Sequence, residues 1–363
     1  MSVTRAAIEA ALSQYTDPHL DQDPVSAGCL REVDIQGDKV RVRLQLGYAA
    51  GLFKSGWAQM LQMALENLDG VDSAQVRVDC VIEAHKAQDQ VPALANVKNV
   101  IAVASGKGGV GKSTTAANLA LALMREGARV GILDADIYGP SQGIMFGIAE
   151  GTRPEVRDQK WFVPLKAHGV EVMSMAFLSD ENTPMVWRGP MVSGALIQLL
   201  TQTAWGDLDY LVVDMPPGTG DIQLTLAQKV PVSGAVIVTT PQDLALLDAK
   251  KGVEMFRKVN IPVLGVVENM AVHICSNCGH AEHLFGEGGG EKLAAQFGVE
   301  LLASLPLSMA IRMQSDGGKP TTIADPQSQI AMIYQEIARN VGARIAQGGQ
   351  QAQAMPSIVI SED

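Results

Sequence analysis

Apolar positions follow two different patterns along this chain, and the change between them lies near residue 98. Polar and apolar residues alternate over 39–46, which predicts a half-buried strand that pairs with a preceding strand through the turn Gly37-Asp38. Apolar residues at helical spacing accompany these strands and predict a small α/β domain over residues 1–85. The elements expected in it are helices at 4–15 and 57–68 and strands at 30–35, 39–46 and 74–81.

From residue 99 onward, short apolar runs without alternation are separated by helical segments. Strands that are apolar at nearly every position predict a mostly parallel sheet covered by helices on both faces. We therefore expect an α/β domain over 98–345, joined to the first domain by a linker at 86–97 and followed by a disordered tail at 346–363. The strands expected in it are 99–104, 130–133, 170–173, 210–213, 235–239, 263–268 and 301–305.

A glycine-rich segment lies between the first of these strands and a helix-forming run. It fits the pattern G-x-x-x-x-G-K-[ST], which cradles the phosphates of a nucleotide with backbone N–H groups and a helix N-terminus, and it predicts a P-loop NTPase. Lys112 is expected to reach the β- and γ-phosphates of ATP, and Ser113 to hold Mg²⁺. The candidate nucleotide-binding residues are Gly106, Lys107, Gly108, Gly109, Val110, Gly111, Lys112, Ser113 and Thr114.

Acidic residues follow two later strands of the predicted sheet. Asp134 and Asp136 come just after one strand, and ligands of open parallel sheets bind beyond the carboxyl ends of strands. Asp136 could orient the attacking water or bind Mg²⁺ through water, although an aspartate there could also cap a helix. Asp214 ends another apolar strand and is expected to hold Mg²⁺ with Ser113, whereas a buried strand before a proline turn would look similar.

A single C-x-x-C pair, Cys275 and Cys278, follows a late strand. Two thiolates can converge on one metal, but a tetrahedral thiolate site needs four ligands. The nearby histidines 273, 280 and 283 could complete a zinc site within one chain. A twofold dimer could instead bring two pairs together around one [4Fe–4S] cluster. A thioredoxin-like redox pair is a third, less favoured reading, and the residues themselves leave zinc and cluster open.

Composition and net charge limit the kinds of binding partner to be expected. The 363 residues carry a formal net charge of −11, which opposes binding to phosphate backbones, so no nucleic-acid partner is expected. No apolar run reaches transmembrane length and the N-terminus has no signal-peptide pattern, so we expect no membrane association and a cytoplasmic location. The four cysteines are then expected to be thiols or metal ligands rather than disulfides.

Taken together and in this order, the motifs resemble those of the bacterial Mrp/ApbC iron–sulfur cluster carriers. They are GKGGVGKS at 106–113, DADIYGPS at 134–141, VWRGPM at 186–191, DMPPGTGD at 214–221, TTPQ at 239–242, CSNC at 275–278 and GGGEKL at 288–293. The second lysine of the nucleotide loop, Lys107, resembles the signature lysine of the deviant Walker A ATPases, a class that includes MinD and ParA. The resemblance covers residues 98 to about 340.

This resemblance implies an ATPase that forms a homodimer and holds a labile [4Fe–4S] cluster between its subunits. Scaffold proteins would donate the cluster, and apo iron–sulfur proteins would receive it. The implied catalytic residues are Lys107, which acts across the dimer, Lys112 and Asp136. Cys275 and Cys278 become cluster ligands, and Asn269 resembles an asparagine that contacts adenine in related ATPases.

Two other classes of protein remain as alternatives. One is a ParA- or MinD-like positioning ATPase with a structural zinc at the C-x-x-C pair, although its expected basic surface or basic amphipathic helix is absent from the sequence. The other is an electron donor like the nitrogenase iron protein, whose ligands come from separate loops. The first domain resembles one that precedes the ATPase in many carriers, but residues 47–52 lack the cysteine often found there. We therefore expect that domain to dock partners or regulate the ATPase.

Overall fold

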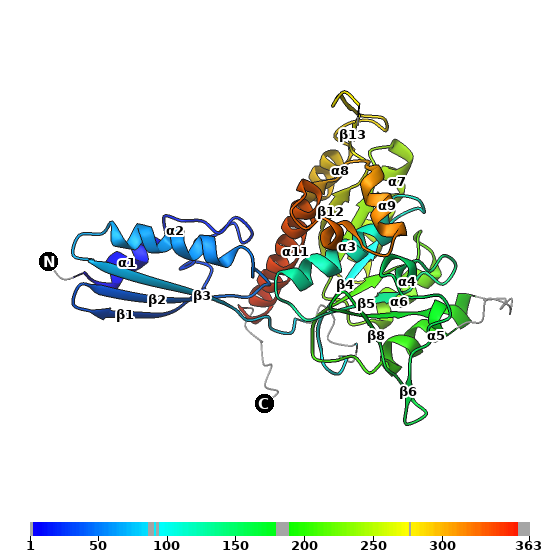
Figure 1. Cartoon of the computed structure of the whole chain (residues 1–363), viewed down its shortest axis with the longest axis horizontal. Coiled ribbons are helices and arrows are strands. Elements are labelled where there is room, and N and C mark those ends of the chain that lie inside the picture. The colour runs from blue at the N-terminus through cyan, green and yellow to red at the C-terminus, as the bar shows by residue number, and fades with distance from the viewer. Residues whose placement is uncertain (1–2, 86–90, 92–93, 179–188, 276, 355–363) are drawn as a thin grey trace, which may run out of the picture. The chain divides into compact units, whose positions relative to one another are not determined.

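The computed structural model describes residues 3–85, 91, 94–178, 189–275 and 277–354 (Figure 1). The chain divides into two compact units. Unit 1 comprises residues 1–85 together with 342–363, and unit 2 comprises residues 86–341. The linker predicted at 86–97 lies mostly outside the described residues, and its last residue, Val97, begins a strand of unit 2.

Unit 1 is a three-stranded sheet with helices packed against it. The strands lie in the order β1-β2-β3; β1 and β2 are antiparallel and joined by the turn at Gly37, whereas β2 and β3 are parallel and joined through α2. Parallel neighbours require such a crossover. The elements are α1 (Arg5–Leu12), β1 (Leu30–Gln36), β2 (Lys39–Leu46), α2 (Lys54–Glu66) and β3 (Ser73–Cys80).

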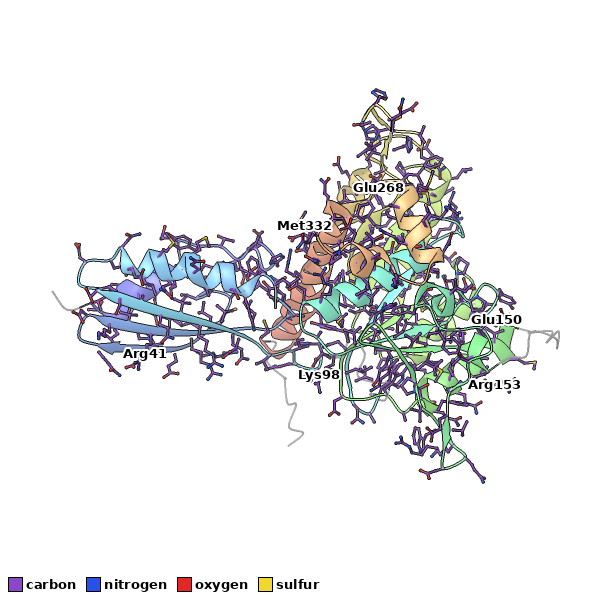
Figure 2. The ribbon with its side chains drawn as sticks, viewed as in Figure 1. Arg41, Lys98, Glu150, Arg153, Glu268 and Met332 are labelled. Atoms are coloured by element: carbon purple, nitrogen blue, oxygen red, sulfur yellow. The ribbon has the colours of Figure 1, made fainter. Side chains whose placement is uncertain are left out.

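The alternation seen in the sequence decides which face of this sheet is buried. Val40, Val42 and Leu44 of β2 point into the core, whereas Arg41 lies on the exposed face (Figure 2). The core between the sheet and the helices also contains Trp57 of α2. Burying such side chains is the main stabilising contribution in a unit of this size.

Unit 2 is built on an eight-stranded sheet in the order β15-β12-β11-β4-β10-β5-β9-β8. All neighbouring pairs are parallel except β8 with β9 at one edge. The predicted mostly parallel sheet is therefore confirmed. Its strands are β4 (Val97–Ala104), β5 (Val130–Asp134), β8 (Leu165–Ala167), β9 (Val170–Ser174), β10 (Leu208–Asp214), β11 (Gly234–Thr239), β12 (Val263–Glu268) and β15 (Leu301–Ser304).

Helices flank this sheet (Figure 1). In the part of the chain that the structure describes, none of them is long and apolar enough to cross a membrane. They are α3 (Lys112–Arg125), α4 (Gln142–Met145), the 3₁₀ turn η1 (Met175–Phe177), α5 (Gly189–Gln202), α6 (Asp221–Lys229), α7 (Asp243–Lys258), α8 (Gly289–Phe297), α9 (Met309–Asp316), α10 (Thr321–Ala324) and the first part of α11 (Gln329–Ala354). From residue 342 onward, α11 belongs to unit 1.

Three features differ from the expected pattern. Short two-stranded ribbons, β6 (Val156–Arg157) with β7 (Trp161–Phe162) and β13 (His273–Ile274) with β14 (Ala281–Glu282), have no clear signal in the sequence. The edge strand β8 was also not predicted.

The third difference concerns the C-terminal segment, where a disordered tail was expected from residue 346. Helix α11 continues to Ala354 instead, and residues 355–363 lie outside the described part. Within unit 1, Ala343 of this helix is part of the hydrophobic core and the Gln347 amide donates to the carbonyl of Leu20. Packing of Ala343 on the core anchors the helix just before the segment where composition suggested a tail.

Candidate nucleotide site and cysteine loop

The glycine loop at 106–114 connects the end of β4 to the start of α3, as the sequence predicted. Gly109 and Gly111 have φ angles of 80° and 83°, which only glycine adopts without strain. At Gly106, a Cβ would lie 2.2 Å from the carbonyl carbon of Asp248 in α7. The loop therefore needs its glycines for two reasons: backbone conformation in the middle, and close contact with α7 at the start.

Lys112 and Asp214 form a buried ion pair at the carboxyl ends of the central strands. Asp214 ends β10, which lies between β4 and β5, so the parallel register brings it beside the loop that follows β4. The Lys112 ammonium also donates to the Ser113 hydroxyl, at 3.2 Å. The structure thus brings together three residues that sequence reasoning assigned to phosphate and Mg²⁺.

Gln142, at the start of α4, joins the same cluster and was not predicted. Its side-chain amide donates to Asp214 Oδ2 at 2.8 Å and to the carbonyl of Ser113 at 3.0 Å. The residue is fully buried. Nothing in the sequence distinguished this glutamine from any other polar residue near a helix start, because its role depends on a contact 72 residues along the chain.

Asp134 and Asp136 have different surroundings although they are two residues apart. Asp134 is buried and accepts backbone N–H groups from Asp136, Ser141 and Gln142, at 2.9–3.2 Å, so it organises the loop after β5. Burial, reinforced by the Asp214 carboxylate, raises its pKa.

Asp136 is only half-buried and lies close enough to the ion pair to sense both of its members. Burial raises the pKa of Asp136; the Lys112 charge opposes this rise and the Asp214 charge adds to it. The placement of Asp136 beside Lys112 and Asp214 suits the predicted role at water or metal.

Lys107 lies at the other end of the loop. Its ammonium is 3.5 Å from Gln242 Oε1 of the same chain, and Gln242 Oε1 also accepts a hydrogen bond of 2.7 Å from the Thr240 hydroxyl. Lys107 therefore lies apart from the ion pair of Lys112, as its early position in the loop suggested.

Asn269 connects the nucleotide loop to the strand that leads toward the cysteines. Its side-chain amide donates to the carbonyl of Val110 at 2.9 Å, and its backbone N–H donates to Thr239 at 2.7 Å. Packing is so close that a Cβ at Gly111 would lie 2.1 Å from Asn269 Nδ2. The predicted adenine contact stays a prediction; the structure places Asn269 against the loop itself.

Glu268, the last residue of β12, fixes the position of Asn269. Its two carboxylate oxygens accept hydrogen bonds from the Gly290 N–H at 2.7 Å and the Ser304 hydroxyl at 3.1 Å. The end of β12 is thereby tied to α8 and β15. Sequence reasoning missed this residue, since a glutamate at a strand end gives no signal of its buried partners.

The cysteine loop turns tightly between β13 and β14. Cys275 donates its N–H to the carbonyl of His280, and Gly279, at a φ of 72°, donates to the carbonyl of Cys275, each at 2.9 Å. N–H groups of Cys278 and Asn277 point to the Cys275 sulfur and lower the pKa of that thiol.

Both cysteines of this loop are accessible: Cys275 is partly exposed and Cys278 exposed. Such a turn prepares a thiolate for a metal. Within the described residues, however, no group of three or more His, Cys, Asp or Glu side chains is placed to hold a metal ion. Among the described residues, the loop thus holds two accessible thiols.

Comparison with known proteins is consistent with this geometry. Residues 96–342 match the family model for the NUBPL iron-transfer P-loop NTPases. The chain belongs to this family. Residues 5–78 match a second model, that of the iron–sulfur cluster assembly proteins.

Curated relatives of this iron-transfer NTPase match along most of their lengths. An iron–sulfur cluster carrier protein of Pseudomonas fragi is 84% identical over 78% of this chain and 99% of its own length. The carrier protein of Escherichia coli K12 is 48% identical over 95% of this chain and 94% of its own length. The mouse iron–sulfur cluster transfer protein NUBPL is 52% identical over 69% of this chain and 79% of its own length.

Solved structures agree on the fold. A nucleotide-binding protein of Archaeoglobus fulgidus in complex with ADP is 41% identical, with a TM-score of 0.55 over 62% of this chain and 88% of that chain. The cell division ATPase MinD of Pyrococcus furiosus, 23% identical with a TM-score of 0.51 over 67% of this chain and 98% of that chain, shares the fold. The predicted P-loop fold is thus confirmed.

Proposed function

We propose that this protein is an ATP-hydrolysing iron–sulfur cluster carrier that binds a labile [4Fe–4S] cluster between two copies of the chain and transfers it to apoproteins. The observation that carries the proposal is the pair of accessible thiols of Cys275 and Cys278, which lie on a tight turn. The pKa of the Cys275 thiol is lowered. The relatives that match along most of their lengths are named as cluster carriers, which supports the same conclusion.

A shared cluster follows from the number of ligands. A [4Fe–4S] cluster takes four thiolates, and the loop of one chain offers two. A twofold axis close to the loop would bring the second pair to the cluster without any further residue. This favours the cluster over a zinc site completed within one chain, because no third ligand joins the two thiols among the residues described.

The nucleotide site has the residues that ATP hydrolysis needs. We assign Lys112 to the phosphates, Ser113 and Asp214 to Mg²⁺, and Asp136 to the attacking water. A serine hydroxyl beside a buried carboxylate is an oxygen donor set that suits Mg²⁺, which neutralises charge on the phosphates when it is bound. To contact the phosphates of ATP, Lys112 would turn from Asp214 toward the nucleotide.

Communication between nucleotide and cluster would run through Asn269. This residue contacts the nucleotide loop and lies six positions before Cys275, so a shift of the loop on ATP binding acts directly on the segment that leads to the thiols. In the dimer, Lys107 of one chain is assigned to the nucleotide of the other. Scaffold proteins as donors and apo iron–sulfur proteins as recipients complete the proposal, in the cytoplasm and without a nucleic-acid or membrane partner.

Anaerobic reconstitution with iron and sulfide tests the proposal. The wild-type chain should gain cluster absorbance and roughly four irons per two chains, and Cys275→Ala and Cys278→Ala should each lose it. Cys80→Ala is the matched control, because it removes a thiol outside the loop and should leave iron uptake unchanged. Stoichiometric zinc in protein purified without oxygen, with no cluster uptake, would refute the carrier function and favour the positioning ATPase.

A further inference from the structure

Gln142 occupies a position in the nucleotide site that the proposed roles leave unexplained. Its side chain is fully buried and lies between the two segments that supply the Mg²⁺ ligands. One amide nitrogen donates to both segments: to Asp214 Oδ2 after β10 and to the carbonyl of Ser113 at the start of α3. Both partners are acceptors, so the amide orientation is fixed by its hydrogen bonds.

The other end of the same amide is a second, independent observation. Gln142 Oε1 is buried and has no hydrogen-bond partner among the described residues. Leaving a buried amide oxygen without a donor costs free energy, so an acceptor of this kind is retained where something else supplies the donor. Water bound to a metal ion is such a donor.

The two oxygens of Asp214 have different partners, and the difference matters when nucleotide binds. Oδ1 pairs with Lys112, and Oδ2 accepts from Gln142. When Lys112 turns to the phosphates, Asp214 loses the ion pair and keeps the hydrogen bond from Gln142. A buried carboxylate that no hydrogen bond holds is free to change rotamer, and that change would displace a magnesium ligand.

We propose that Gln142 is a positioning residue for magnesium: it holds Asp214 in place relative to Ser113 while Lys112 leaves, and its free Oε1 accepts a hydrogen bond from a water of the ion. The inference rests on the ATPase site of the proposed function and assigns one more residue to it. The amide contacts the nucleotide loop only at the carbonyl of Ser113, and its other partner is Asp214, so both of its hydrogen bonds go to residues assigned to Mg²⁺. Its loss should therefore weaken chiefly the magnesium-dependent part of nucleotide binding.

Calorimetric titration of the full-length, cluster-free protein with ADP, in EDTA and over a series of MgCl₂ concentrations, tests this role. The variant Gln142→Met keeps the length of the side chain but loses its hydrogen bonds. In this variant, we expect the MgCl₂ concentration that gives half of the maximal enhancement of ADP binding to rise by about tenfold. A change of this size is usual when a group that orients metal ligands is lost. ADP affinity in EDTA should stay within a factor of about two. Gln198→Met, an exposed glutamine on α5, is the control and should behave as wild type.

Three results would overturn the inference or its basis. An unchanged magnesium requirement in Gln142→Met, or an equal loss of ADP affinity with and without Mg²⁺, would show that Gln142 is structural only. If Gln142→Met does not fold, Gln142→Ala, which adds no bulk, is measured in its place against the same two criteria. ADP binding that is independent of Mg²⁺ in the wild type would instead overturn the magnesium assignment itself, whereas cluster uptake by Cys275 and Cys278 would be unaffected.

Discussion

Two glycines of the nucleotide loop, two residues apart, provide a direct test of how the loop is packed. A Cβ at Gly106 would lie 2.2 Å from the carbonyl carbon and 2.4 Å from the carbonyl oxygen of Asp248 in α7. These atoms are backbone, so no side-chain rotation relieves the contact. At Gly108, a Cβ meets nothing within 4 Å, and φ is not in the left-handed region. Alanine should therefore destabilise the protein at position 106 and not at position 108.

For Gly106→Ala, helix α7 must withdraw from the loop by at least about 1.2 Å to reach ordinary contact distance in a densely packed interior. Overpacking of this kind costs about 1–3 kcal/mol of unfolding free energy. Gly108→Ala should be neutral or stabilise the protein by up to about 1 kcal/mol, since alanine restricts the unfolded chain.

Thermal unfolding of the nucleotide-free variants, followed by circular dichroism, measures the difference. For a unit of this size, each kcal/mol lowers Tm by about 2–4 °C. We expect Gly106→Ala to unfold several degrees below Gly108→Ala and to bind ADP more weakly than wild type. Equal melting temperatures for the two variants would refute the packing of α7 against the start of the loop.

Other predictions concern the reactivity of the cysteine thiols, the role of Lys107 in ATP hydrolysis, and the hydrogen bond from Asn269 to the nucleotide loop. In apo protein, iodoacetamide should modify Cys275 faster than an ordinary thiol at neutral pH, because the lowered pKa of Cys275 enlarges its thiolate fraction. Burial raises the pKa of Cys29 to about 11, so this cysteine should stay unmodified. Peptide mass spectrometry at several pH values measures both rates. Lys107→Ala should lower the ATPase rate at concentrations where the protein dimerises. If the variant hydrolyses ATP at the wild-type rate, Lys107 has no role in catalysis. Asn269→Ala leaves the carbonyl of Val110 without its donor and should cost about 1–3 kcal/mol of stability, measured by urea unfolding; no change would show that the contact is not formed in solution.

Local patterns predicted most of the fold because each strand carries its own signal. The apolar runs before Asp134 and Asp214 are buried at every position, and both became central strands. The order of the strands and the unpredicted edge strand β8 depend on pairing between distant segments, which a local pattern does not contain. The continuation of α11 past residue 346 depends in the same way on burial of Ala343 in a core built from the other end of the chain.

In the candidate site, too, residues that belong to local motifs were predicted, whereas residues whose roles depend on distant contacts were not. Lys112, Ser113 and Asp214 were predicted because their motifs specify both the residue type and its place, at the start of a helix for Lys112 and Ser113 and at the end of a strand for Asp214. The structure brings them together. Gln142 and Glu268 were missed because ordinary polar residues acquire their roles only through buried partners far along the chain. The cysteine pair by itself left zinc and cluster open, since the number of ligands around one loop depends on its surroundings, and only the resemblance to cluster carriers favoured the cluster.

Transfer of the cluster is the measurement that tests the central claim most directly. Protein reconstituted without oxygen is mixed with an apo-enzyme that gains activity only with a [4Fe–4S] cluster, in the presence of a chelator that captures free iron. The carrier function predicts that activity appears while the cluster absorbance of the donor falls, and that Cys275→Ala and Cys278→Ala donors transfer nothing. Activation at the same rate by these variants, or retention of the cluster by the wild-type protein, would contradict it.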